Sequence, residues 1–448
     1  MSKIVLPEQS KMLQPDFIFG VATSSFQIEG GRDLRQKNIW DTFCTGPNIL
    51  DKSNGDIACD HFHRWEEDVE HIQALNVDAY RMSIAWPRVL HQDGSLNEAG
   101  LAFYEAVIDK VKALGKKVFV TLYHWDLPQH LEDQGGWLNR DTAHAFAAYA
   151  DIVSQRLGDK VDAWTTLNEP FCAGHLSYEA GVHAPGLTGR KNGRQASHNL
   201  LLAHGLALPI LRKNCPHAQH GIVLNIHPGY AASDSPADIE ATELATQYLF
   251  TWYIDAVLKG EYPEVINHLA PEDRPEIQDG DMALISAPID FMGMNYYTRN
   301  VYRSDGNGWY EHVAPAPEGL TEMGWEIVPE AFSKMLIDLD KEYDLPDLYI
   351  TENGAAMPDQ LVDGKIHDAD RIAYFQSHLL AVDKALEAGV NIKGYFAWSL
   401  LDNFEWALGY SKRFGLIYVD YPTQRRIWKD SAYAYQSMLE SRKTTMLG

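Results

Sequence analysis

The stretch AWTTLNEP, residues 163–170, is an apolar run that ends in an amide, a carboxylate and a proline. A second stretch, DLYITENG at residues 347–354, follows the same plan and ends in a carboxylate, an amide and a glycine. Short apolar runs that close on a chain-turning residue are typical of buried parallel strands entering a loop. The turns would leave Glu169 and Glu352 facing outward from the end of such a sheet, although each glutamate could instead cap the helix that follows.

Eight apolar runs of this kind are spread along the chain. They cover residues 17–25, 79–86, 117–125, 163–170, 221–227, 290–297, 347–354 and 392–402. Amphipathic helical patterns lie between them, such as 98–115, in which apolar residues recur every three or four positions before a terminating glycine. Eight strand–helix units predict an α/β fold, a single (β/α)8 TIM barrel that takes in residues 1–448 as one domain.

Further helical patterns cover residues 142–157 and 371–387, and another begins after Asp60, which is predicted to be its N-cap. The connections at 26–60 and 298–328 are long, so we expect them to build the active-site rim. A doubly wound open sheet is the alternative architecture. The chain lacks the GxGxxG turn that such a sheet would use for a dinucleotide, which favours the barrel.

The balance of charges bears on the partners of the chain. The 62 acidic and 38 basic residues give a formal net charge of −24 at pH 7, which would repel nucleic acids and anionic membranes. Solubility is the simplest role for this charge. No apolar run approaches the roughly 20 residues of a membrane span, and the first residues contain no signal-peptide core. We therefore expect a cytoplasmic protein that acts on a small molecule.

The cysteines point away from zinc and from disulfides. Cys44, Cys59, Cys172 and Cys215 are widely spaced and form no CxxC pair. In a cytoplasmic protein reduced thiols are expected. The sequence does not determine the oligomeric state, for which a dimer is the commonest symmetric outcome.

Polar and aromatic residues gather where the predicted strands end. In a barrel these ends meet at one face, where active sites are built. The residues at or just beyond the ends are Gln27, Glu29, Arg81, His124, Trp125, Asp126, Asn168, Glu169, Asn295, Tyr296, Tyr297, Glu352, Asn353, Trp398, Asp402, Glu405 and Trp406. The chain has neither an HExxH zinc motif nor a GxSxG elbow.

The cleavage of a glycosidic bond requires paired carboxylates such as Glu169 and Glu352. One must carry a proton for the leaving oxygen, and the other must be ionised to attack the anomeric carbon. We expect repulsion in a cleft to raise one pKa, while a cation and hydrogen bonds hold the other low. Arg81 is the candidate cation and Tyr297 the candidate donor to the nucleophile, although a structural ion pair and a packed core tyrosine are the alternatives.

Sugar recognition needs bidentate polar groups for paired hydroxyls and flat apolar faces for the C–H side of the ring. The polar candidates are Gln27, His124, Asn168 and Glu405, and the flat ones are Trp398 and Trp406. Trp125 belongs with them, with core packing as its alternative. His61 and His63 are closely spaced, but they fall at a predicted helix start, and we predict no metal ion and no cofactor.

Seven segments carry a family resemblance. They are FIFGVATSSFQIEGG (17–31), YRMSIAWPR (80–88), TLYHWDLPQ (121–129), TLNEP (166–170), GMNYYTRN (293–300), ITENG (350–354) and WSLLDNFEWALGYSKRFG (398–415). In this order they resemble glycoside hydrolase family 1, the β-glucosidase family, over essentially the whole chain. The resemblance implies the barrel fold and the hydrolysis of β-glycosides.

The resemblance also implies a role for each matching residue. Glu169 would be the general acid/base, and Glu352 the nucleophile that forms a glycosyl-enzyme intermediate. The contacts implied for the non-reducing sugar are Gln27, His124, Asn168, Glu405 and Trp406, with Trp398 as a stacking platform. The positions implied around the nucleophile are Arg81, Asn295 and Tyr297. Trp325 would line the leaving-group side, with Cys172 near the same wall.

Two departures known within the family are absent here. Plant thioglucosidases carry Gln in place of the acid/base, whereas Glu169 is intact. Relatives that act on 6-phosphosugars carry Ser where Glu405 stands, and a carboxylate would repel a phosphate. We therefore expect a retaining, exo-acting β-glucosidase for cellobiose, cello-oligosaccharides and aryl or alkyl glucosides. A β-galactosidase or β-fucosidase of the same fold is one alternative, and a sugar-binding relative without turnover is another.

Overall fold

The computed structural model describes residues 2–447, with the surroundings of side chains described through residue 443. Eight parallel strands close into a barrel in the order β1-β13-β10-β7-β5-β4-β3-β2. Their bounds are β1 Ile18–Ala22, β2 Ala79–Ser83, β3 Lys117–Tyr123, β4 Ala163–Asn168, β5 Gln219–Asn225, β7 Phe291–Asn295, β10 Asp347–Asn353 and β13 Ile392–Trp398. Each strand overlaps one of the eight predicted runs, so the predicted barrel is confirmed and the open sheet is excluded.

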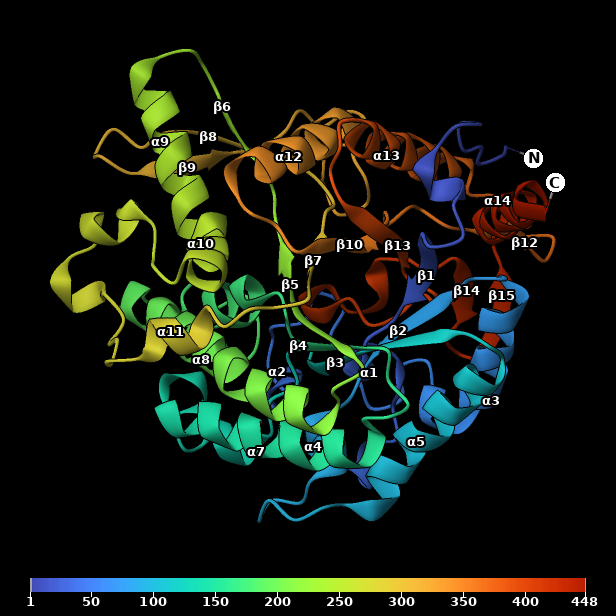
Figure 1. The fold of residues 1–448 in the computed structure, drawn as a ribbon, viewed down its shortest axis with the longest axis horizontal. Coiled ribbons are helices and arrows are strands. Elements are labelled where there is room, and N and C mark those ends of the chain that lie inside the picture. Colours follow the sequence, from blue (N-terminus) through green and yellow to red (C-terminus); the bar gives the residue numbers. More distant parts are fainter. Residues whose placement is uncertain (1, 448) are drawn as a thin grey trace.

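Helices return the chain outside the barrel after each of these strands (Figure 1). They are α3 His61–Ala74, α5 Glu98–Ala113, α7 Arg140–Leu157, α8 Arg190–Asn214, α9 Pro236–Thr246, α10 Trp252–Lys259, α12 Pro329–Glu342, α13 Ala369–Glu387 and α14 Asp430–Leu447. Asp60 is the N-cap residue of α3, as predicted, but its side chain makes no capping hydrogen bond. Its backbone is left-handed rather than extended, and its carboxylate contacts His63 and Arg64.

Shorter elements occupy the connections. The short α-helices are α1 Ser25–Ile28, α2 Ile39–Phe43, α4 Trp86–Val89, α6 Gln129–Glu132 and α11 Asp281–Ile285. The small sheets combine β6 Gly229–Ala231, β8 Asn300–Ser304 and β9 Tyr310–Val313; β11 Leu361–Val362 and β12 Lys365–Ile366; and β14 Ile417–Asp420 and β15 Arg425–Trp428. The 3-10 turns are η1 Lys11–Leu13, η2 Arg32–Leu34, η3 Gly136–Leu138, η6 Glu264–His268, η7 Pro271–Asp273 and η8 Trp406–Ser411, and the π-helical turns are η4 Phe171–Leu176 and η5 Gln247–Thr251.

Aromatic rings fill the interior of the barrel. Phe119, Phe291, Tyr349 and Phe396 are at most 4% exposed, and the centroids of neighbouring rings lie 4.9–6.3 Å apart. Gly20 makes room for them, because a Cβ at this position would approach the Phe396 ring to 2.4 Å. The barrel is therefore a packed core and not a pore, so a ligand can enter only above this aromatic layer.

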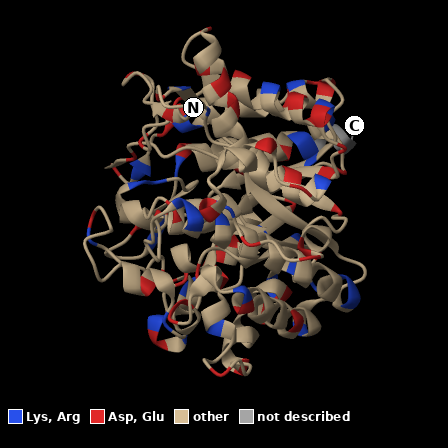
Figure 2. Ribbon diagram, turned by 90° about the vertical axis from the view of Figure 1, so that its left-hand side faces the viewer, with Lys and Arg blue, Asp and Glu red and all other residues tan. Residues whose placement is uncertain are grey.

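Charged residues of both signs are distributed over the outer helices and loops (Figure 2). Within residues 2–447, no helix is both long and apolar enough to cross a membrane. The four cysteines are free thiols, which agrees with the reduced state that we expected.

Candidate active site

A pocket of about 780 Å³, measured with its open mouth, lies at the C-terminal end of the barrel strands. Most of the predicted site residues line it, namely Gln27, His124, Trp125, Asn168, Glu169, Tyr297, Trp325, Glu352, Trp398, Glu405 and Trp406. The two remaining predicted residues do not line the pocket. Arg81 is 1% exposed and contacts Glu352, and Asn295 is 0% exposed and contacts Glu169. The fold thus brings the whole predicted set together.

Both glutamates come from strand ends where the hydrogen-bond ladder is irregular. The register of β10 against β7 shifts between Ile350 and Glu352, and that of β4 against β5 shifts between Thr165 and Asn168. Such bulges re-aim the side chains that follow them. Glu169 itself has φ +50°, a left-handed backbone that is uncommon outside glycine. The irregular strand ends turn both carboxylates toward the pocket.

Two tryptophans of the pocket have the same backbone feature. Trp125 has φ +80° and Trp406 has φ +47°, and their ring centroids are 4.6 Å apart. The indole N–H of Trp125 donates a hydrogen bond of 2.8 Å to the backbone carbonyl of Asn168. Left-handed non-glycine residues cost of order 1–3 kcal/mol each and gather at functional sites. Three such residues line this pocket, which supports it as the candidate functional site.

Glu352 is surrounded by hydrogen-bond donors. Arg81 Nη1 lies 2.8 Å from one carboxylate oxygen, and the hydroxyl of Tyr297 donates to the other at 2.5 Å. The carboxylate is almost fully buried, so both contacts act away from bulk water. The cation and the phenol hold opposite oxygens of the carboxylate, and these are the two contacts that the sequence predicted.

Glu169 has a different environment. Asn295 Nδ2 donates to Oε1 at 2.8 Å, and the Cys172 thiol lies 3.2 Å from Oε2. Burial first, and then the charge of Glu352, raise the pKa of Glu169 to about 8 against the opposing effects of Asn295, Cys172 and Arg81. Glu169 therefore carries a proton at neutral pH, which suits an acid.

A chain of hydrogen bonds connects the two glutamates. Asn168 Oδ1 accepts from Arg81 Nη2 at 2.7 Å and from Asn295 Nδ2 at 3.1 Å, so Asn168 joins the residue bound to Glu352 to the one bound to Glu169. The sequence predicted Asn295 near the nucleophile. It does lie opposite Glu352 in the strand register, but its amide contacts Glu169.

The His124 ring is nearly parallel to two tryptophan rings of the pocket. The His124 ring lies 6.1 Å from the rings of both Trp398 and Trp406 and is within 16° of parallel to each. Burial, together with the charge of Arg81, lowers the pKa of His124 well below its usual value, so the imidazole is neutral. Its Nδ1 has no hydrogen-bond partner among the described residues. A neutral imidazole with a free nitrogen is suited to a sugar hydroxyl.

Gln27 is held by the protein on both sides of its amide. Its nitrogen donates to Asn403 Oδ1 and to the Phe404 carbonyl, both at 2.9 Å, and its oxygen accepts from Ser24 at 2.5 Å. The oxygen keeps one lone pair for a ligand. Gln27 is thus positioned in advance, and only its oxygen remains available to a substrate.

Glu405 has a buried oxygen without a partner. Its Oε2 forms no hydrogen bond within the described chain, although it lines the pocket. Burial, with the charges of Glu352 and Glu169, raises the pKa of Glu405 to about 8. Buried polar atoms in native proteins are nearly always satisfied, so this oxygen indicates where a ligand donates.

We expect Glu405→Gln to stabilise the protein at pH 8 and to have little effect at pH 4. The folded pKa of about 8 lies above the ordinary 4.5, so ionisation of this group costs stability that grows as the pH rises between these values. The neutral amide removes this cost, and the free energy of unfolding should rise by about 1–2 kcal/mol at pH 8. Thermal unfolding of both proteins at the two pH values measures it. An equal gain at pH 4 would show that charge is not the cause.

Three further carboxylates at the predicted rim belong to the scaffold. Glu29 pairs with Arg88 at 2.9 Å, and Asp126 accepts from Ser25 at 3.0 Å. Asp402 lies 2.6 Å from both Lys429 and Arg413. The ion pairs of Asp402 anchor the loop that carries Glu405 and Trp406. None of the three lines the pocket.

Several pocket residues were not predicted. They are Phe171, Leu176, His183, Asn225, His227, Met323, Ala407, Leu408 and Phe414. Asn225 and His227 lie at the end of the fifth apolar run, so the position of strand ends could have predicted them. Phe171 and Leu176 bound the π-helical turn η4 after β4, and His183 follows in a loop; no periodicity in the sequence points to them.

His61 and His63 serve local contacts. His61 Nδ1 lies 2.7 Å from Asp68, and His63 Nδ1 lies 2.6 Å from Asp60. No group of three or more potential ligands that could hold a metal occurs within residues 2–447.

Two buried glutamates with different surroundings lie at the mouth of a closed parallel barrel, beside tryptophan rings. This combination is typical of a barrel enzyme that cleaves glycosides. The chain belongs to glycosyl hydrolase family 1, whose family model matches residues 9–444. The resemblance inferred from the seven motifs is thereby confirmed.

Named relatives match nearly the full length. A β-glucosidase of an Agrobacterium species is 45% identical over 432 residues, which cover 94% of each chain. A bifunctional β-D-glucosidase/β-D-fucosidase of Bifidobacterium breve is 41% identical, covering 94% of this chain and 97% of the relative. The crystal structure of a family 1 β-glucosidase from Exiguobacterium antarcticum B7 is similar with a TM-score of 0.93 at 46% identity, covering 96% of this chain and 99% of that one.

Proposed function

We propose that this chain is a retaining, exo-acting β-glucosidase that releases terminal non-reducing β-D-glucosyl residues from cellobiose, short oligosaccharides and aryl or alkyl glucosides. The observation that carries the proposal is the unequal pair of glutamates. Glu352 is held by a cation and a phenol, while Glu169 is buried beside it with a pKa raised to about 8. This division suits a nucleophile and an acid/base. The β-glucosidases among the relatives support the same sugar.

In the proposed reaction, Glu352 attacks the anomeric carbon while Glu169 gives its proton to the leaving oxygen. The glycosidic bond breaks, and a glycosyl ester forms on Glu352. Glu169 then takes a proton from water while the water oxygen attacks the anomeric carbon. The bond between that carbon and Glu352 breaks, Glu352 leaves as a carboxylate, and the sugar is released with its original configuration. Arg81 and Tyr297 hold Glu352 in place throughout.

The pocket residues are assigned to the two parts of the substrate. In this proposal the glucosyl unit is bound by Gln27, His124, Asn168, Glu405 and Trp406, with Trp398 as its stacking face and Trp125 beside it. The unpartnered oxygen of Glu405 supports this assignment, since it would accept hydrogen bonds from the 4- and 6-hydroxyls of the sugar. Trp325 would line the leaving-group side. Residues 1–448 would form one catalytic domain, an inference supported by the family match from residue 9 to 444.

A 2-deoxy-2-fluoro glucoside with a good leaving group tests the proposal. It should inactivate the enzyme and add one fluoroglucosyl group to the peptide that contains Glu352, as read by mass spectrometry. Labelling of another residue would reject this nucleophile. Slow hydrolysis of the parent nitrophenyl glucoside together with the absence of any label would reject the double displacement.

A β-fucosidase is the second candidate, because one relative carries both activities. The two sugars differ at C4 and C6, which are the positions assigned to Glu405. Rates on nitrophenyl glucoside, galactoside and fucoside decide between the candidates. We expect the glucoside to be cleaved with the highest kcat/KM, and a fucoside strongly ahead would overturn the glucosidase assignment.

A further inference from the structure

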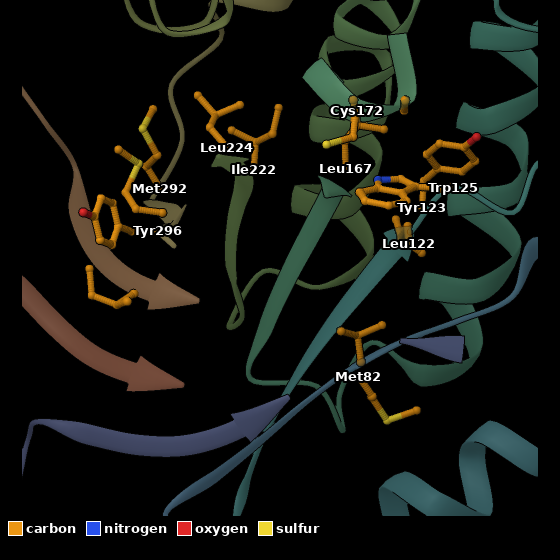
Figure 3. Close-up of a cluster of buried hydrophobic side chains, with 14 of the residues drawn as sticks. Met82, Leu122, Tyr123, Trp125, Leu167, Cys172, Ile222, Leu224, Met292 and Tyr296 are labelled. Carbon is orange, nitrogen blue, oxygen red and sulfur yellow. The ribbon is translucent and has the colours of Figure 1, made fainter. Parts of the chain in front are cut away.

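The thiol of Cys172 contacts the proposed acid/base. Cys172 is the second residue of the turn η4 and lies three residues after Glu169, and its backbone N–H donates to the Glu169 carbonyl at 2.9 Å. Its Sγ lies 3.2 Å from Glu169 Oε2, which is close for a contact to sulfur. Cys172 is 6% exposed and lines the pocket. Figure 3 shows it beyond the end of β4, near Leu167 and Trp125.

The oxygen that faces the thiol is the one that carries the proton. Asn295 Nδ2 donates to Oε1 of Glu169, and Thr351 donates to Asn295 Oδ1 at 2.7 Å, which fixes the orientation of that amide. Because Oε1 must remain an acceptor, the proton of neutral Glu169 sits on Oε2. The thiol therefore contacts the atom that would exchange protons with the leaving group and with water.

Cys172 is a donor in this contact. Burial, and then the charge of Glu169, raise the pKa of the Cys172 thiol well above its usual value, so the sulfur keeps its proton. The other charged or titratable groups that act on Glu169 or respond to it come from separate elements: Arg81 on β2, Tyr297 after β7, Glu352 on β10 and Glu405 after β13. Within the described chain, Cys172 is the one donor to Oε2.

We propose that Cys172 is a positioning residue for the acid/base, whose S–H donates to the proton-carrying oxygen of Glu169 and favours its anionic form. The inference rests on the proposed function. When the Oε2 proton passes to the leaving oxygen, the thiol compensates part of the new negative charge and keeps its own proton. The thiol continues to donate to the Glu169 carboxylate until Glu169 takes a proton from water. A thiol is a weak donor, so it assists ionisation without preventing Glu169 from being protonated at neutral pH.

The test compares Cys172→Ala with Cys172→Ser in the pH profile of kcat/KM on benzyl glucoside, whose leaving group needs a proton. The basic limb of this profile reports Glu169 in the free enzyme. Alanine removes the donor, so the basic limb should move to higher pH by about half a pH unit to one pH unit. Serine supplies a stronger donor, so the limb should move down by a similar amount. The order alanine, wild type, serine from high to low pH is the expected result.

Cys215→Ser is the matched control. This second buried thiol contacts the Ser154 carbonyl at 3.7 Å and lies outside the pocket, so its loss should leave the limb in place. A shift of the alanine and serine variants in the same direction would reduce Cys172 to a packing residue. No shift in either variant would overturn the inference as well.

A substrate that needs no acid separates this inference from the proposed function. With 2,4-dinitrophenyl glucoside the leaving group departs without a proton, so the limb set by Glu169 should disappear from kcat/KM in the wild type and in both Cys172 variants. If the wild type cleaves neither glucoside, the proposed function fails. If it cleaves both and the limbs on benzyl glucoside do not follow the expected order, only the role of Cys172 fails.

Discussion

Glu352→Ala should lower kcat on nitrophenyl glucoside by about 10⁴-fold or more, because removal of a nucleophile abolishes the covalent step. The carboxylate is held by Arg81 and Tyr297, so the substitution also leaves a buried cation without its partner. Circular dichroism and thermal unfolding should accompany the rate measurement, to separate lost chemistry from lost folding. Glu272→Ala, which removes an exposed glutamate from η7, is the control and should keep full activity.

Azide provides a chemical check on the same variant. The cavity left by Glu352→Ala admits a small anion on the face from which the nucleophile attacks. Azide should therefore restore turnover and yield the α-glucosyl azide, with inverted configuration, as identified by NMR. A β-glucosyl azide from this variant would mean that Glu352 and Glu169 have exchanged roles.

Glu169→Gln is expected to have the second largest effect, and its size should depend on the leaving group. On cellobiose or benzyl glucoside we expect a loss of about 10²–10⁴-fold in kcat/KM, the usual contribution of a general acid. On 2,4-dinitrophenyl glucoside, kcat/KM should fall far less, because that leaving group needs no proton. An equal loss on both kinds of substrate would indicate a structural role for Glu169.

The pH dependence of kcat/KM is an independent test of the role of Glu169. Glu169 has a pKa of about 8 in the folded protein, so it is protonated and competent as an acid below that value. In the wild type, kcat/KM on benzyl glucoside should fall as the pH rises through about 8. The remaining activity of Glu169→Gln should not show this basic limb. If the limb persists in the variant, another group sets it.

The eight strands could be predicted because each is buried on both faces and therefore reads as a continuous apolar run. The residues at their ends could be predicted for a related reason: in a closed parallel barrel all C-terminal ends meet at one face. This rule found Glu169 and Glu352 without any knowledge of loop shape. It also selected Glu29, Asp126 and Asp402, since a strand end does not tell whether a carboxylate enters the pocket or forms an ion pair beside it.

Asp60 takes the predicted N-cap position, but its side chain makes no capping hydrogen bond, because capping depends on backbone angles and not on residue type alone. The sequence also could not predict the contact of Asn295 with Glu169. Neighbours in the register of two strands share a face only while the ladder is regular, and here the ladder shifts next to Glu352.

The amino-acid sequence by itself determined the barrel, the family and the set of polar residues at the mouth, because periodicity and strand order are properties of the chain. Tertiary structure alone shows how the surroundings of the two proposed catalytic glutamates differ. Glu169 and Glu352 both end apolar runs beside an asparagine, so their residue pattern does not distinguish them and only the family resemblance implied separate roles. Only folding brings Arg81 and Tyr297 to Glu352 and leaves Glu169 buried with an amide and a thiol. The proposed division of roles rests on burial and on neighbours distant in the chain, since these set the free energy of each charge.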